Sequence, residues 1–152
     1  MKNILSIIFI TFFGLTISAQ VKWFTIEEAV IEQKEHPDKK LFVDFYTDWC
    51  GYCKTMEKKT LNEEVISKLI NTHFIPVKFN AEKQTVFTYR GEKFELLEGS
   101  NGKTLNMFAY RALMGNIGYP SFVVVDGKGK FIDGAQGYFT PKQFMPFLKR
   151  NL

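Results

Sequence analysis

The chain has 152 residues, 45% of them hydrophobic and 16% aromatic, which is enough to form one well-packed domain. Its formal net charge is +4 at pH 7, and these charges are scattered rather than collected in runs, so they do not indicate a nucleic-acid-binding surface. The two cysteines are too few for a small secreted domain that several disulfides hold together.

Residues 1–19 have the pattern of a secretory signal peptide. Lys2 precedes an apolar run over residues 4–17, and small residues follow it. The run is shorter than the roughly twenty residues of a membrane-spanning helix, so we expect cleavage after Ala19 rather than an uncleaved anchor. The mature chain, residues 20–152, is then a single domain in a compartment where disulfides form, with no stable membrane insertion.

The first part of the mature chain predicts a helix, a buried strand and a second helix. Thr25 and Glu28, three residues apart, form a capping box for a helix that reaches Glu35. The continuous apolar segment 41–47 is typical of a central strand that is buried on both faces. A long helical stretch begins at Cys50, directly after this strand.

This helical stretch is expected to break near residues 60–62, where Asn62 caps a second segment over 63–71. Residues 74–80 predict the next strand. Pro76 lies within it, and because proline cannot donate to a sheet, we expect it near the beginning of the strand or at an edge-like position.

Residues 81–104 differ from the alternating pattern and are interpreted as an insertion. The sequence Arg90-Gly91-Glu92 predicts a hairpin turn, because aromatic residues alternate on both sides of it, and residues 99–102 predict a further turn or loop. Two hypotheses stay open for the insertion: it shapes a substrate groove near the functional site, or it is only an elaboration of the surface.

The rest of the chain returns to alternating helix and strand. In order, it predicts a helix over 106–114, a strand over 121–125, a turn over 126–129, a strand over 130–133, and a helix from Thr140-Pro141 to about residue 148. Pro146 should kink this last helix or shift its start. These elements predict an α/β fold with a central mixed sheet flanked by helices.

Cys50 and Cys53 lie at the start of the helix that follows the buried strand. The unpaired amides and the dipole of a helix N-terminus favour the thiolate form of Cys50. We therefore assign Cys50 as the exposed nucleophile and Cys53, one turn later, as the more buried resolving thiol. As an inert structural disulfide, the pair would close only a tiny loop and stabilise the fold little. A zinc site would need further ligands, and neither His36 nor His73 has zinc-ligand spacing, so no metal is expected.

Three segments resemble the thioredoxin superfamily. Residues 43–54 (VDFYTDWCGYCK) are similar to its active-site segment, in which a strand with an internal Asp leads into WCxxCK. Residues 77–80 (VKFN) resemble the next strand with its Lys, and residues 117–122 (IGYPSF) resemble the loop with the cis-proline. The resemblance covers about residues 22–152 except for 81–104, and it is nearest to exported bacterial thioredoxin-like proteins. It implies a thioredoxin fold.

The resemblance also implies roles for single side chains. Asp44 matches the buried acid that accepts the proton of Cys53, although an Asp held by hydrogen bonds at a strand end is the alternative. Lys78 would tune Asp44, unless it is an ordinary solvent-facing Lys. Pro120 matches the cis-proline, and the backbone of Tyr119 would pair with an extended substrate segment.

The residues around the nucleophile are assigned to substrate binding. Trp49, Gly51 and Tyr52 would surround Cys50, although a core position is the alternative for a large aromatic such as Trp49. Thioredoxin itself has Pro where this chain has Tyr52. The motif CGYC resembles that of periplasmic disulfide isomerases, so we expect a reduction potential between those of thioredoxin and the strongest oxidants.

Together these features predict an exported, periplasmic thiol:disulfide oxidoreductase that reduces disulfides in other proteins by dithiol exchange, without a cofactor. Its expected partners are disulfide-containing proteins and a membrane thiol electron donor, and nucleic acid is not among them. The alternatives are a disulfide oxidase or isomerase, and a non-catalytic binding module of the same fold. The intact Trp49–Lys54 segment argues against the binding module.

Overall fold

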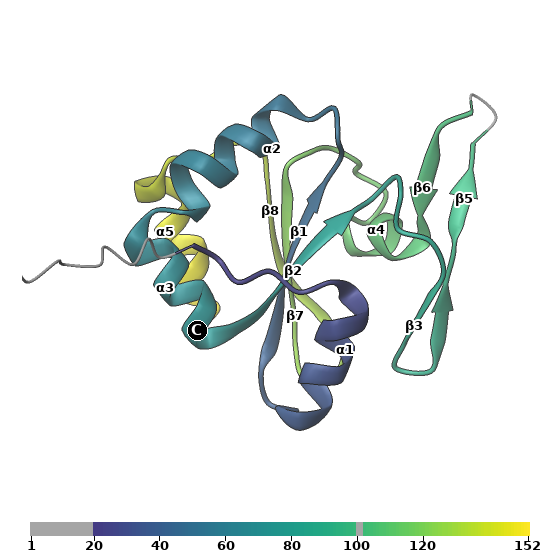
Figure 1. Ribbon diagram of the computed structural model, residues 1–152, viewed down its shortest axis with the longest axis horizontal. Helices are drawn as coiled ribbons and strands as arrows, with labels where there is room; N and C mark the ends of the chain where they lie inside the picture. Colours follow the sequence, from purple (N-terminus) through teal and green to yellow (C-terminus); the bar gives the residue numbers. More distant parts are fainter. Residues whose placement is uncertain (1–19, 100–101) are drawn as a thin grey trace, which may run out of the picture.

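A computed structural model describes residues 20–99 and 102–152 (Figure 1). The predicted signal peptide lies outside the described residues. The centre of the fold is a four-stranded mixed sheet in the order β2-β1-β7-β8, in which β1 pairs parallel with β2 and antiparallel with β7. Its strands are β1 (Lys40–Tyr46), β2 (Phe74–Asn80), β7 (Ser121–Val125) and β8 (Phe131–Gln136). The predicted mixed sheet is therefore confirmed.

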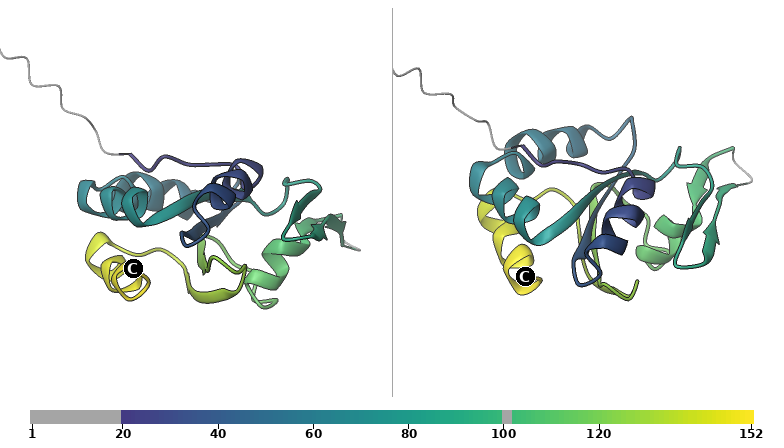
Figure 2. Two further views of the ribbon diagram at one scale, coloured as in Figure 1. Left: turned by 90° about the horizontal axis from the view of Figure 1, so that it is seen from below. Right: turned by 60° about the horizontal axis from the view of Figure 1, so that its bottom comes forward.

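Helices cover both faces of this sheet. They are α1 (Ile26–Glu35), α2 (Gly51–Met56), the π-helical turn η1 (Glu57–Leu61), α3 (Glu64–His73), α4 (Met107–Ala112) and α5 (Pro141–Arg150). Figures 1 and 2 show α2, α3 and α5 on one side of the strands and α1 and α4 on the other. Within the described residues, no helix is both long and apolar enough to cross a bilayer.

Strand β1 is buried on both faces, as its continuous apolar sequence predicts. Because successive side chains of a strand point to opposite faces, Val43 and Phe45 pack with α1 and α4, whereas Phe42 packs with α3 and α5. Asp44 lies between these apolar neighbours in the middle of the strand, at 2% exposure. The strand thus places one carboxyl group inside the protein.

The capping box of α1 is confirmed, since Glu28 N donates to Thr25 Oγ1 at 3.2 Å and Thr25 N donates to Glu28 Oε2 at 2.8 Å. The prediction for the start of α3 was wrong by one residue. Glu63 is the N-cap, and its carboxylate accepts a hydrogen bond from Ile66 N at 3.0 Å. Asn62 instead ends the π-helical turn, which fills the break that the sequence predicts.

Pro76 is the third residue of β2 and lies opposite Phe42 of β1. Within residues 20–99 and 102–152, the other side of β2 has only a single bridge, between Phe24 and Val77, so β2 is the outermost full strand of this sheet. Phe24 N donates to Pro76 O at 2.9 Å, a contact that uses the carbonyl and not the missing N–H. Pro76 is therefore at an edge-like position, as predicted.

The insertion forms two hairpins rather than one. The predicted hairpin pairs β3 (Phe87–Tyr89) with β4 (Glu92–Phe94), and its two turn residues have positive φ angles, 51° at Arg90 and 80° at Gly91. A second hairpin pairs β5 (Leu96–Glu98) with β6 (Thr104–Asn106), where the sequence predicted only a turn. Short strands with few β-branched residues explain why this second hairpin gave no clear signal.

The first hairpin belongs to the core, so the hypothesis of a mere surface elaboration is wrong for this part of the insertion. The rings of Phe87, Tyr89 and Phe94 lie 5.5, 6.0 and 5.2 Å from the ring of Phe108, which is fully buried in α4. Edge-to-face contacts of this kind stabilise the fold beyond what the burial of apolar surface contributes. The hairpin and α4 therefore stabilise each other.

The C-terminal elements differ from the predictions only in length. Strand β8 continues to Gln136 because its pairing with β7 extends as far as Ser121. Helix α5 begins at Pro141, as predicted, and Pro146 lies inside it without shifting this start.

Removing the ring of Phe108 tests how much its contacts with the first hairpin stabilise the fold. We expect Phe108→Ala to lower the free energy of unfolding by about 3–5 kcal/mol, because it leaves a cavity between α4 and the first hairpin. Urea unfolding followed by circular dichroism measures this loss. Ile31→Ala is the control: Ile31 is 61% exposed on α1, and its truncation should change stability by no more than about 0.5 kcal/mol.

Candidate active site

The two cysteines lie where β1 leads into α2. Cys50 is the N-cap residue of α2 and Cys53 lies inside the helix, and they form a disulfide with their Cα atoms 5.3 Å apart. Cys53 N points at the sulfur of Cys50, 3.1 Å away. When the pair is reduced, this amide and the helix dipole stabilise a negative charge on Cys50 Sγ. The arrangement supports Cys50 as the attacking thiolate.

The expected difference in exposure between the two cysteines is not found. Cys50 is 4% exposed and Cys53 is 5% exposed, so the prediction of an exposed nucleophile was wrong for the disulfide form. The sulfur of Cys50 lies against the first turn of the helix, 3.1 Å from Cys53 N. The two residues differ in position instead, since one caps the helix and the other lies within it.

The aromatic residues next to the cysteines face solvent. Trp49 is 68% exposed and Tyr52 is 70% exposed, so the alternative of a core position for Trp49 is wrong. A Cβ placed on Gly51 would meet no atom within 4 Å, which shows that this position is open on the surface. The ring of Trp49 meets the ring of Tyr119 edge-on, with 6.0 Å between the centroids. These side chains form a rim around the disulfide.

The loop before β7 completes this rim. The bond between Tyr119 and Pro120 is cis, and Pro120 is buried. Gln136 holds the loop in place, because its Nε2 donates to Asn116 O at 2.9 Å and to Ser121 Oγ at 3.0 Å. Within the described residues, the N–H and C=O groups of Tyr119 make no backbone hydrogen bond, so both are available to a ligand.

A buried ion-pair cluster lies behind the cysteines. Parallel pairing of β1 and β2 places Asp44 opposite Lys78, and Lys78 Nζ lies 2.8 Å from Asp44 Oδ2 and 3.0 Å from Glu57 Oε2. Burial raises the pKa of the Asp44 carboxyl, although attraction to the Lys78 ammonium works against this rise. Asp44 Oδ1 has no hydrogen-bond partner within the described residues. Lys78 is therefore not an ordinary solvent-facing lysine, and Asp44 is not satisfied at a strand end.

A cavity of about 440 Å³ is lined by Lys78 and Glu57 of this cluster and by Cys53. Its lining residues are Tyr46, Thr47, Asp48, Cys53, Lys54, Glu57 and Lys78. Water in such a polar cavity can carry a proton between the Cys53 thiol and the acid–base cluster. Asp44 is not among the residues that line the cavity, but Lys78, which is paired with it, is.

Sequence reasoning missed two acidic residues at this site. Glu57 is four residues after Cys53, the spacing at which helix side chains share a face, and this spacing could have indicated it. Glu82 follows β2, and its Oε2 accepts a hydrogen bond from Trp49 Nε1 at 2.8 Å. Burial, followed by the negative charge of Glu82, raises the pKa of Tyr119 to about 12. No sequence pattern indicates this contact, because it depends on how the β2–β3 connection folds.

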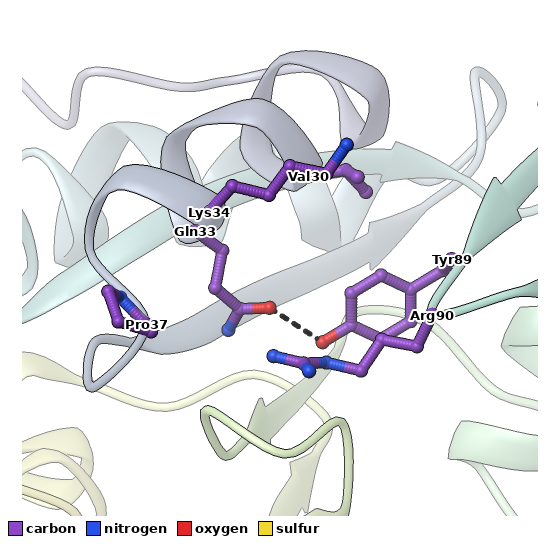
Figure 3. Close-up of a pocket in the computed structure, with 6 residues that line it drawn as sticks. All are labelled: Val30, Gln33, Lys34, Pro37, Tyr89 and Arg90. Carbon is purple, nitrogen blue, oxygen red and sulfur yellow. Dashed lines mark hydrogen bonds between the residues drawn. The ribbon is translucent and has the colours of Figure 1, made fainter.

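A second, smaller pocket of about 230 Å³ lies between α1 and the first hairpin (Figure 3). Tyr89 donates its hydroxyl hydrogen to Gln33 Oε1 at 2.9 Å, and both side chains are buried there. None of the residues that line this pocket belongs to the cysteine site. The hydrogen bond between these two buried side chains attaches the hairpin to α1.

A CxxC disulfide at a helix N-terminus, with a buried carboxyl group behind it, is the arrangement of a thiol–disulfide oxidoreductase. The chain belongs to the thioredoxin-like domain family, which matches residues 26–151. The mixed sheet and the helices on both of its faces agree with this assignment.

Individual relatives were compared with the chain. It is 27% identical over 121 residues to the thiol:disulfide interchange protein DsbD of Neisseria meningitidis, a match that spans 78% of this chain but only 16% of the relative. The DsbD C-terminal domain of the same species, in the reduced form, has 24% identity and a TM-score of 0.53, over 83% of this chain and 93% of that structure. A thioredoxin from Thermus thermophilus has 19% identity and a TM-score of 0.62, over 87% of each chain.

Replacing the buried acid should stabilise the fold in a pH-dependent way. A carboxyl whose pKa is raised by folding costs stability once the pH exceeds its unfolded-state pKa of about 3.9, and the cost is complete above the raised value. We therefore expect Asp44→Asn to unfold at higher urea concentration than wild type at pH 7, with a gain that shrinks as the pH falls to about 4.

Asp126→Asn is a control in which the expected change in stability has the opposite sign. The pKa of Asp126 is lowered, chiefly by a backbone hydrogen bond from Lys130 N, so its charge favours the folded state. Asp126→Asn should therefore lower stability at pH 7 and lose this effect at acid pH. A pH-independent gain in Asp44→Asn would show that Asp44 has an ordinary pKa.

Proposed function

We propose that this chain is exported to the periplasm, where it reduces disulfides in other proteins through the Cys50–Cys53 pair. The observation that carries the proposal is the redox pair at the N-terminus of α2 together with the buried Asp44 and a cavity that reaches Cys53. A structural disulfide would not need a proton acceptor. No cofactor takes part in the proposed reaction.

The reaction exchanges two electrons between two pairs of sulfurs. The Cys50 thiolate attacks one sulfur of the substrate disulfide; a mixed disulfide forms, and the other substrate sulfur leaves as a thiolate. The Cys53 thiol gives its proton to Asp44 through water in the cavity, and its thiolate attacks Cys50 Sγ. The second substrate sulfur leaves, the substrate has gained two electrons, and the Cys50–Cys53 disulfide is closed again.

The rim of the site supports binding of an extended polypeptide. The free backbone N–H and C=O groups of Tyr119 can pair with a substrate strand, which is a short form of β-augmentation. Trp49 and Tyr52 offer exposed aromatic surface beside it, and the open position of Gly51 leaves room for the substrate chain. In this proposal, Pro120 and Lys78 position the loop and the acid, respectively.

We also propose a membrane thiol protein as the electron donor. The relatives named DsbD are thiol:disulfide interchange proteins, and the present chain spans about 16% of their length. The chain would then receive electrons by the same dithiol exchange that it performs on its substrates. We propose that residues 1–19 are removed on export, so the mature protein recovered from a periplasmic fraction should begin at Gln20 by mass spectrometry. A chain recovered with Met1 intact would contradict this.

The direction of exchange depends on the reduction potential of the cysteine pair. Equilibration of the mature protein with dithiothreitol or glutathione buffers measures it. A value near that of thioredoxin, about −270 mV, would support the reductase, whereas a value approaching about −120 mV would favour an oxidase or isomerase. If the pair cycled in neither buffer, the catalytic proposal would fail, leaving a structural disulfide or a non-catalytic binding module.

Substitution of each cysteine should separate their roles. With Cys53→Ser, attack by Cys50 still occurs but the mixed disulfide cannot be resolved, so we expect it to accumulate with substrate proteins. With Cys50→Ser, we expect neither accumulation nor turnover, a loss of at least about 10³-fold. Non-reducing gel electrophoresis after acid quenching detects the trapped species. Trapping by Cys50→Ser instead would reverse the assigned roles.

A further inference from the structure

The connection between β2 and β3, residues 80–85, is held by the second hairpin of the insertion. Asn106 is fully buried at the end of β6, and its Nδ2 donates to Gln84 O and Thr85 O, both at 2.9 Å. Asn106 N also donates to Ala81 O at 2.8 Å. These contacts leave the connection little freedom relative to the hairpin. We call residues 80–85 the bridge segment.

A fourth contact leads from the hairpin to the rim of the active site. Thr104 Oγ1, on β6, donates to Glu82 O at 2.6 Å, in the middle of the bridge segment. The carboxylate of the same residue accepts the hydrogen bond from Trp49 Nε1. Thr104 is thus joined to the indole of Trp49 through a single residue.

The bridge segment also holds the turn that carries Trp49. Asn80 Nδ2 donates to Asp48 Oδ1 at 2.9 Å, and Asn80 Oδ1 accepts from Glu82 N at 3.1 Å. Lys83 Nζ lies 2.5 Å from Asp48 Oδ2. The bridge segment therefore contacts the hairpin through Thr104 and Asn106 and the Asp48–Trp49 turn through Asn80 and Lys83. Figure 1 shows this connection running from β2 toward the hairpins.

An indole that is 68% exposed has little packing to fix its rotamer, so its hydrogen bond and its ring contact with Tyr119 determine where it lies. We propose that the β5–β6 hairpin positions the Trp49 indole through Thr104 and Glu82, and thereby determines how tightly a protein substrate binds beside the disulfide. This inference rests on the exchange function proposed above. Thr104 and Asn106 are positioning residues, since they touch neither the cysteines nor the substrate.

The proposal predicts different effects on large and small substrates. Thr104→Val keeps the side-chain shape but removes the donor to Glu82 O. We expect the KM for insulin, with dithiothreitol as electron donor, to rise by about three- to tenfold, the range that one hydrogen bond allows. The kcat for insulin and the rate with the small disulfide 5,5′-dithiobis(2-nitrobenzoic acid) should not change. Thr88→Val, at an exposed position of β3 outside these contacts, is the matched control.

Two substitutions at Glu82 test whether Thr104 acts on Trp49 through this residue. Glu82→Ala removes the acceptor of the Trp49 N–H, whereas Glu82→Gln keeps an acceptor oxygen there, so we expect a smaller rise in KM with Glu82→Gln than with Glu82→Ala. If Thr104 acts through Glu82, the KM effects of Thr104→Val and Glu82→Ala will not multiply in the double variant. Independent, multiplying effects would overturn the proposal.

Nuclear magnetic resonance gives a readout that does not depend on turnover. Each tryptophan contributes one indole N–H signal, and Trp49→Phe identifies the signal of Trp49. We expect this signal to shift and to exchange faster with water in Thr104→Val and Glu82→Ala. An unchanged signal, or equal losses with insulin and the small disulfide, would refute positioning by the hairpin. If wild type reduced neither disulfide, the proposed function would fail, while the indole signal would still decide whether Thr104 positions Trp49.

Discussion

The burial of Asp44 is the constraint on which the site depends. A carboxylate in the middle of a central strand is costly unless a counter-charge lies within hydrogen-bond distance. Parallel pairing with β2 supplies that counter-charge, since it places Lys78 directly opposite. A register shift of one residue would turn Lys78 to the other face and leave the acid unpaired. The register of the two strands therefore determines whether the buried acid behind the cysteines is paired.

The charge cluster also has an aromatic environment. Lys78 Nζ lies 4.8 Å from the ring centroid of Trp23 and 5.1 Å from that of Tyr46. Aromatic faces attract an ammonium group and exclude part of its water, so they help to keep Lys78 charged next to two acids. The segment that precedes α1 thus contributes to the site although it is far from the cysteines in sequence.

The sequence was sufficient to predict the elements that have strong local signals. The capping box at Thr25, the apolar segment of β1 and the WCGYCK motif each gave the correct element or position, and resemblance to a known family indicated Asp44 and Lys78. The second hairpin and the contact of Glu82 with Trp49 were missed. Both depend on tertiary contacts between segments whose own sequences favour no particular structure. The burial of Cys50 was also missed, because the exposure of a helix N-cap depends on the elements packed around it.

The two positions between the cysteines have a consequence for how this protein can evolve. Gly51 borders open space, and Tyr52 projects into solvent, so neither contributes to the hydrophobic core. Substitutions there can change the electrostatic surroundings of the disulfide while the free energy of folding stays nearly constant. Selection can therefore act on the redox poise separately from stability, and descendants of this chain with different directions of electron flow need not acquire a new fold.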